Sequence, residues 1–259
     1  MNETPDTLLA PADPPAFTVD GGNGTSPFLF VADHAGRRIP QRLGQLGLAD
    51  AELERHIAWD IGAGAVACLI GKALNAVVIR QTYSRLVIDC NRRPGSATSI
   101  VKLSELTPVP GNLGLSDDDS RARLEEIFKP YHNRIAQELD RRRAAVRPAI
   151  LISVHSFTPV FKSVPRPWHV GVLHNRDPRC ARILLELLNC EEGLIVGDNE
   201  PYSLSDESDY TIPIHGEQRG LPHVELEIRQ DLITQEAGQQ KWAALLVRVL
   251  PQVYERLKS

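Results

Sequence analysis

The chain has 259 residues, of which 42% are hydrophobic, and its 29 lysines and arginines against 33 aspartates and glutamates give a net charge of −4. This length and hydrophobic fraction are typical of one large α/β domain with a substantial core. The charge balance leaves no basic footprint for nucleic acid or an anionic membrane. The acidic start lacks a signal-peptide pattern and no stretch is long enough to span a bilayer, so we expect a cytoplasmic protein.

Cysteine supplies no recognisable metal or disulfide motif. The four cysteines, at positions 68, 90, 180 and 190, include no C-x-x-C pair and lie in mostly apolar contexts. We therefore expect reduced, packed thiols and a metal site, if there is one, built from other residues.

The sequence divides into a short arm and one domain. Residues 1–26 are rich in Pro, Asp, Gly and Thr, which predicts a flexible N-terminal arm before a folded domain over residues 27–259. In chain order we predict strand 28–32, helix 51–73, strands 76–80 and 86–90, helix 116–143 with Pro130 as a candidate kink, strands 150–154 and 168–173, helix 178–188, strand 223–228 and helix 235–257. This alternation predicts a single three-layer α/β domain with a mixed, largely parallel sheet.

Two of the predicted strands are followed by a histidine. His34 comes just after strand 28–32, and His155 comes just after strand 150–154. Either histidine alone is more often a packing residue than a ligand. Because ligands bind beyond the carboxyl ends of parallel strands, the two together suggest a shared site.

The segment after Arg85 collects cationic and amide groups, including Asn91 and Arg92. The planar fork of arginine suits the capture of a substrate carboxylate. A solvated basic loop explains the same composition equally well. We expect Asp89, within this segment, to orient one of the arginines.

Strand 223–228 presents acidic residues on one face. Glu225, Glu227 and Arg229 alternate, so they share a face of the strand. A salt-bridged surface strand explains this pattern, and so does a divalent metal or a catalytic water facing Glu227. With the two histidines and the arginines, these residues match the parts of a zinc hydrolase, except that a third metal ligand is still missing.

Five motifs together resemble the N-formylglutamate amidohydrolase family, which is similar to the zinc carboxypeptidases. They cover nearly the whole chain from Phe28 and are the sequences DHAG at 33–36, HIAWDIG at 56–62, SRLVIDCNR at 84–92, VHSF at 154–157 and ELEIRQD at 225–231. The resemblance implies an α/β fold of the carboxypeptidase type. It also implies hydrolysis of the amide bond of an N-acyl amino acid.

The resemblance also implies roles for individual residues. His34 and His155 would be zinc ligands, and Glu227 would be the general base that activates the attacking water. Arg92 would hold a substrate carboxylate, with help from Arg85 or Arg219. Asn91 and Ser156 are expected to contact the substrate as well.

The third metal ligand departs from the carboxypeptidase pattern. Carboxypeptidases place a glutamate three residues after the first histidine, whereas this chain has Arg37 there. Asp60 is our candidate, with ligation and orientation of His34 as equal alternatives. Asp33 competes, although neighbours leaving a strand point to opposite faces, and so does His56, which would share a helix face with Asp60.

Two polar loops have the composition of substrate-binding segments, at residues 197–203 and 214–220. In the second loop, His215 or Arg219 is expected to stabilise the tetrahedral oxyanion. We assign the remaining histidines to packing or to the surface, at positions 132, 169, 174 and 223.

These observations predict a zinc-dependent amidohydrolase that converts N-formyl-L-glutamate to formate and glutamate, with iron or manganese as alternative metals. A peptide-cleaving carboxypeptidase or amidase is an alternative for the same site. A non-catalytic small-molecule binding protein on the same scaffold is the alternative from a different class. The expected partner is a small acidic N-acyl amino acid.

Overall fold

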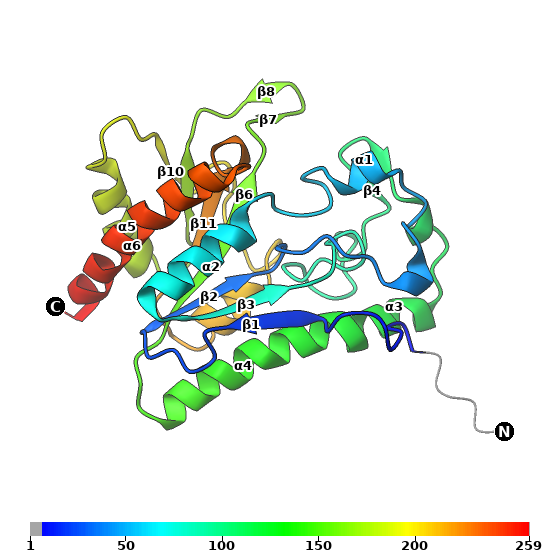
Figure 1. The fold of residues 1–259 in the computed structure, drawn as a ribbon, viewed down its shortest axis with the longest axis horizontal. Coiled ribbons are helices and arrows are strands. Elements are labelled where there is room, and N and C mark those ends of the chain that lie inside the picture. Colours follow the sequence, from blue (N-terminus) through cyan, green and yellow to red (C-terminus); the bar gives the residue numbers. More distant parts are fainter. Residues whose placement is uncertain (1–6, 259) are drawn as a thin grey trace.

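The computed structural model describes residues 7–258, which fold around a seven-stranded sheet (Figure 1). The strand order is β1-β3-β2-β6-β11-β9-β10. The strands are β1 (Phe17–Asp20), β2 (Phe28–Ala32), β3 (Val77–Gln81), β6 (Ile150–Phe157), β9 (Val170–Leu173), β10 (Val196–Asp198) and β11 (His223–Arg229). Two small hairpins lie outside the sheet: β4 (Leu103–Ser104) with β5 (Thr107–Pro108), and β7 (Val160–Phe161) with β8 (Val164–Pro165).

The centre of the sheet is parallel. β2 pairs in parallel with β3 and β6, and β6 pairs in parallel with β11. β9 runs antiparallel to β11, and β1 runs antiparallel to β3. The sheet is therefore mixed and mostly parallel, as predicted, and β2 and β6 are buried along their whole length because both faces are covered.

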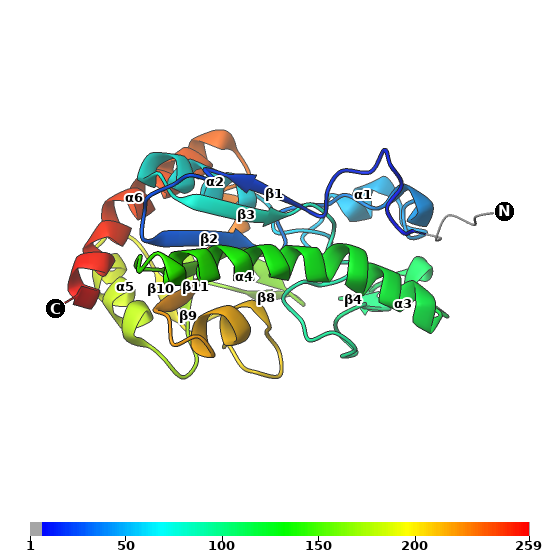
Figure 2. The same ribbon diagram turned by 90° about the horizontal axis from the view of Figure 1, so that it is seen from below.

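Helices cover the sheet on both faces (Figure 2). α2 (Ala63–Leu74), α5 (Arg179–Asn189) and α6 (Glu236–Lys258) pack their apolar residues into one core, and α4 (Lys129–Ala144) packs into a second core on the opposite face. The three-layer prediction is confirmed. Among residues 7–258, no helix combines the length and the apolar character needed to cross a membrane.

The long helix predicted over residues 116–143 is continuous but irregular. It comprises α3 (Asp117–Arg123), a wider π-helical turn at Leu124–Phe128, and α4. Ser116 caps it, because its side chain accepts a hydrogen bond from the backbone N–H of Asp119 at 3.1 Å. Pro130 has no N–H to donate to the preceding turn, and the wider turn accommodates this loss without breaking the helix.

Two predicted elements are wrong. The helix expected over residues 51–73 is split into α1 (Asp50–Leu53) and α2, with irregular backbone between them. Gly62 ends that irregular stretch at φ +81°, and a Cβ there would lie 2.2 Å from the carbonyl oxygen of Ile233. The strand expected over residues 86–90 is a series of turns, because its apolar side chains fill the second core without joining the sheet.

Part of the expected flexible arm belongs to the sheet. Residues 17–20 form β1, and Phe17 and Val19 pack against the second core because they alternate with polar neighbours. Residues 1–6 lie outside the described residues. All four cysteines are free thiols; Cys90 and Cys180 are buried, whereas Cys190 is exposed.

Candidate active site

A cavity of about 430 Å³ lies beyond the carboxyl ends of β2, β6 and β11. His34 enters it two residues after β2, His155 lies near the end of β6, and Glu227 lies on β11. The register of the sheet pairs Glu227 with His155. Eight of the ten site residues predicted from the sequence line the cavity: His34, Asp60, Arg85, Asn91, Arg92, His155, Ser156 and Glu227.

One carboxylate connects the two strand-end histidines. Asp60 Oδ2 lies 2.7 Å from His155 Nδ1 and 3.3 Å from His34 Nδ1. The backbone N–H of Asp60 donates to the carbonyl oxygen of His34 at 2.9 Å, which fixes the irregular segment against the end of β2. Within the described chain, these three residues form a group whose ligand atoms all lie within 4.8 Å of one another.

The second nitrogen of each histidine is also held by a carboxylate. His34 Nε2 lies 2.7 Å from Asp89 Oδ1, and His155 Nε2 lies 3.2 Å from Asp33 Oδ2. Such outer carboxylates fix the ring and the tautomer of metal-binding histidines. The inward-facing set of two Nδ1 atoms and one carboxylate oxygen matches the donors of catalytic zinc sites.

The alternative third ligands lie elsewhere. Asp33 faces the outer side of His155, and its other oxygen accepts a hydrogen bond from Thr211 Oγ1 at 2.7 Å. His56 does not share a helix face with Asp60, because α1 ends at Leu53. Its Nε2 instead lies 3.2 Å from Glu105 Oε1.

The buried carboxylates and imidazoles of the group shift one another's pKa. Burial alone would raise the pKa of Asp60, but His34 and His155 outweigh it and hold the pKa below its ordinary value. Burial would lower the pKa of His155, but Glu225, Asp33 and Asp60 raise it well above its ordinary value. Buried carboxylates on both sides of the His155 ring thus favour positive charge at this position.

The two arginines of the cavity are held differently. Arg85 donates from Nη2 and Nε to Asp89 Oδ2 at 2.8 and 3.2 Å, and from Nη1 to Asp60 Oδ1 at 3.4 Å. Asp89 therefore orients an arginine, as expected, and also holds His34. Arg92 uses only Nη1, which donates to Asp209 Oδ1 at 3.2 Å and to the carbonyl oxygen of Asn91 at 2.9 Å. Among residues 7–258, its Nε and Nη2 have no hydrogen-bond partner, since every contact of this guanidinium uses Nη1.

Glu227 is a buried carboxylate with a free oxygen. Its Oε2 has no hydrogen-bond partner among the described residues. Burial raises the pKa of Glu227 to about 7, against the attraction of His155. A carboxyl group whose pKa lies near neutrality can both accept and return a proton.

Two of the predicted residues do not reach the cavity. His215 is buried in the helical segment Ile212–Glu217, where its Nε2 lies 3.0 Å from Nδ1 of His132 on α4. Arg219 donates to Asp140 at 2.7 Å, away from the lining residues. The expectation for both rests on loop composition, which does not reveal that this loop folds into a helical turn packed against α4. The structure therefore supports neither as an oxyanion or substrate residue.

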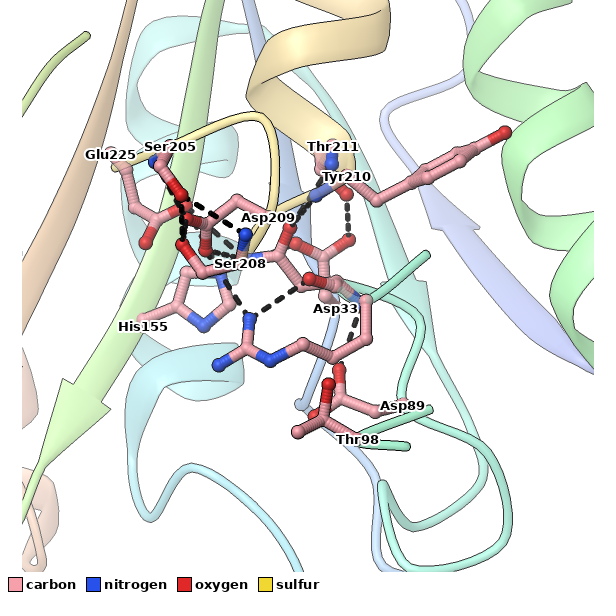
Figure 3. Close-up of polar contacts among 12 residues, drawn as sticks. Asp33, Asp89, Thr98, His155, Ser205, Ser208, Asp209, Tyr210, Thr211 and Glu225 are labelled. Carbon is pink, nitrogen blue, oxygen red and sulfur yellow. Dashed lines mark hydrogen bonds and ion pairs between the residues drawn. The ribbon is translucent and has the colours of Figure 1, made fainter. Parts of the chain in front are cut away.

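Several lining residues were missed by the sequence analysis. Glu225, for which the sequence pattern predicts no specific role, lines the cavity, and Asn91 Nδ2 donates to its Oε2 at 3.5 Å. The predicted loop 197–203 does contribute Pro201, Tyr202 and Ser203, but the lining extends to Ser208 and Asp209. The close-up in Figure 3 shows Ser205, Ser208 and Asp209 gathered beside Glu225 and His155. A polar, serine-rich loop was the only sequence signal for them.

Comparison with known proteins identifies the family. The family described as N-formylglutamate amidohydrolase matches residues 26–234. The chain belongs to this family. The resemblance expected from the five motifs is thereby confirmed.

Two curated relatives match part of the chain. An N-formylglutamate deformylase of Pseudomonas putida is 30% identical over 143 residues, which are 51% of this chain and 52% of that protein. One from Pseudomonas aeruginosa is 27% identical over 143 residues, 51% of this chain and 53% of that protein. The match thus spans about half the length of these relatives.

Two solved structures share the fold over almost the whole chain. A gene product of Agrobacterium tumefaciens is 34% identical, with a TM-score of 0.94 over 97% of this chain and 100% of that chain. An N-formylglutamate amidohydrolase from Ralstonia eutropha is 15% identical, with a TM-score of 0.68 over 94% of this chain and 98% of that chain. At that identity, the second likeness concerns the fold alone.

Proposed function

We propose that this chain is a metal-dependent amidohydrolase that converts N-formyl-L-glutamate and water to formate and glutamate. One arrangement carries the proposal. A three-residue donor set for a divalent ion, a buried carboxylate with a free oxygen and an arginine with free donors all line one cavity. Family membership supports the choice of an N-formyl amino acid as substrate.

His34 Nδ1, His155 Nδ1 and Asp60 Oδ2 would hold the metal. Zinc suits two imidazoles and one carboxylate, and iron and manganese are the alternatives. A bound divalent ion supplies Lewis acidity, which polarises the amide carbonyl and lowers the pKa of the attacking water. Asp89 and Asp33 would keep the two rings in the ligating orientation.

Glu227 would move the proton. It accepts a proton from the water that attacks the formyl carbon, and it delivers that proton to the glutamate nitrogen as the C–N bond breaks. Its buried position and raised pKa suit both steps. The unpartnered Oε2 is the atom on which the proton would reside.

Arg92 would bind a carboxylate of the substrate through Nε and Nη2. Arg85 contributes positive charge, but its three nitrogens already serve Asp89 and Asp60, so we assign it to holding the site together. Ser156 Oγ donates to the carbonyl oxygen of Ile61 at 2.9 Å. We therefore propose that this hydroxyl contacts the substrate as a hydrogen-bond acceptor.

A substrate panel tests the proposal. Purified protein is assayed for release of the free amino acid from N-formyl-L-glutamate, N-acetyl-L-glutamate and glutamate-containing dipeptides. We expect the formyl compound to have the highest kcat/KM. Activity on the dipeptides alone contradicts the proposal and favours a carboxypeptidase. Protein that neither retains zinc nor gains activity on any of the compounds when zinc is added favours a binding protein. A cytoplasmic location belongs to the same proposal and agrees with four free thiols.

A further inference from the structure

Asp209 lies in the loop that follows β10, next to Arg92, which we propose to bind the substrate. The carboxylate is buried and lines the cavity. Its Oδ2 accepts hydrogen bonds from the backbone N–H of Ser205 at 3.0 Å and from Ser208 Oγ at 2.5 Å (Figure 3). These contacts fix one oxygen to its own loop. The other oxygen is left to face the cavity.

The other oxygen, Oδ1, contacts both Asn91 and Arg92. Asp209 Oδ1 accepts from Arg92 Nη1 at 3.2 Å and from Asn91 Nδ2 at 3.3 Å. With Nη1 engaged in this way, the planar guanidinium can turn only within narrow limits. Its Nε and Nη2 edge is therefore kept free for a ligand.

Asn91 fastens the loop from the opposite side. Its Oδ1 accepts hydrogen bonds from the backbone N–H groups of Tyr210 and Thr211, each at 3.0 Å. Thr211 Oγ1 in turn donates to Asp33, which holds His155 (Figure 3). The arginine and the histidine are thus positioned by one continuous set of hydrogen bonds through a single loop.

We propose that Asp209 is the positioning residue that sets Arg92 to receive a substrate carboxylate, and hence a determinant of specificity for acidic substrates. This inference rests on the proposed function. Arg92 touches the substrate, and Asp209 acts through it. Loss of Asp209 should then weaken recognition of the carboxylate more than it slows the chemistry.

Kinetics with matched substrates test the proposal. N-formyl-L-glutamate is compared with its two monoamides, N-formyl-L-glutamine and the α-amide. The amide whose KM changes least in the Arg92→Gln variant is the one that lacks the carboxylate held by Arg92. For Asp209→Ala we expect KM for N-formyl-L-glutamate to rise about tenfold, with kcat within about threefold. For the amide that lacks the held carboxylate we expect KM within about threefold. A similar loss on all three compounds, or a loss in kcat alone, overturns the proposal.

Control variants separate positioning from folding. Asp206→Ala removes an exposed carboxylate of the same loop that pairs with Arg176, and we expect unchanged kinetics. Asp209→Asn keeps an oxygen for Arg92 and should recover part of the loss, and it provides the test if Asp209→Ala does not fold. In an Arg92→Gln background, Asp209→Ala should change KM by less than about twofold. Additive effects of the two substitutions contradict the proposal.

Calorimetry with L-glutamate distinguishes this proposal from the proposed function. We expect Asp209→Ala to weaken glutamate binding about tenfold and Asp206→Ala to leave it unchanged. Wild-type protein that binds glutamate but hydrolyses no N-formyl compound contradicts the proposed function, while the binding comparison still decides the role of Asp209. Wild-type protein that neither binds nor hydrolyses contradicts both.

Discussion

Asp60 Oδ2 lies 2.7 Å from His155 Nδ1, and this contact joins two segments that are 95 residues apart in the chain. It places Asp60 in one group with His34 and His155 that could hold a metal ion, and we propose Asp60 as the third ligand because this chain has Arg37 where the carboxypeptidase pattern has a glutamate. Arg37 instead stacks over Trp59 and pairs with Glu54. Of the three candidates weighed from the sequence, Asp60 is the one that lies within this group.

Replacing Asp60 tests this assignment. Asp60→Ala should fold but retain little zinc after dialysis, because two imidazoles alone bind a divalent ion weakly. We expect wild-type protein to retain about one zinc ion per chain. His56→Ala is the control and should retain as much zinc as the wild type, since its imidazole pairs with Glu105. Equal zinc content in Asp60→Ala would remove Asp60 from the ligand set.

The outer carboxylates should tune metal affinity without abolishing it. Asp89→Asn and Asp33→Asn each weaken the hold on one histidine ring. We expect zinc affinity to fall about 10- to 100-fold in each variant, as measured by competition with a chromophoric chelator. Affinity within a factor of about two of the wild type would mean that the rings are fixed by packing alone.

Glu227 should be needed for turnover and not for metal binding. Glu227→Gln keeps the shape of the side chain but cannot accept a proton. We expect an unchanged zinc content and a kcat lowered at least about 100-fold, because general-base catalysis contributes about 10²–10⁴-fold. Glu236→Gln, in the first turn of α6 and remote from the cavity, is the matched control. Retained turnover in Glu227→Gln would exclude the general-base role.

The buried pair of His132 and His215 should make stability depend on pH. Burial lowers the pKa of His132 to about 4 and that of His215 to about 3, so both are neutral in the folded protein. In the unfolded chain both bind protons below their ordinary pKa of 6.5. The contribution of these two histidines to the free energy of unfolding should therefore be complete above pH 6.5. It should decrease as the pH drops from 6.5 toward 4, by on the order of 3 kcal/mol per histidine.

Urea denaturation at several pH values checks this expectation. His215→Gln removes one of the two titrating groups. The slope of the unfolding free energy against pH between 4.5 and 6.5 should therefore decrease, by up to about 2.303RT per pH unit. An unchanged slope in His215→Gln would show that the acid sensitivity comes from other groups.

The start of β2 depends on a fully buried arginine. Arg142 donates to Glu138 at 2.9 Å and to the carbonyl oxygens of residues 26–28 at 2.9–3.1 Å. Arg142→Met should lower the free energy of unfolding by about 3–5 kcal/mol, because it leaves Glu138 with its charge less compensated. Arg143→Met, at a position 81% exposed, should change it by no more than about 0.5 kcal/mol. Comparable losses in both variants would contradict this reading.

The sequence predicts well those parts of the site that follow the sheet. His34, His155 and Glu227 lie at strand ends or on a strand, where the carboxyl-end rule and the period of two determine which way a side chain points. The parallel sheet and its covering helices were predictable for the same reason. Most predicted boundaries differ from the observed ones by one or two residues.

The parts that depend on irregular backbone were not predictable. Residues 86–90 have the apolar character of a strand, yet they are turns, because burial in a core does not require a ladder of hydrogen bonds. His215 has the sequence context of a loop, yet it packs against His132. Asp209 reaches Arg92 across 117 residues through loop contacts that no local pattern encodes.

Zinc titration of metal-free protein, with glutamate release from N-formyl-L-glutamate as the readout, tests the central claim most directly. We expect negligible activity after chelation and a rise in proportion to zinc that ends at about one ion per chain. Asp60→Ala should show no such rise at equal total zinc. Full activity in metal-free protein, or no activity on this substrate at saturating zinc, would contradict the account.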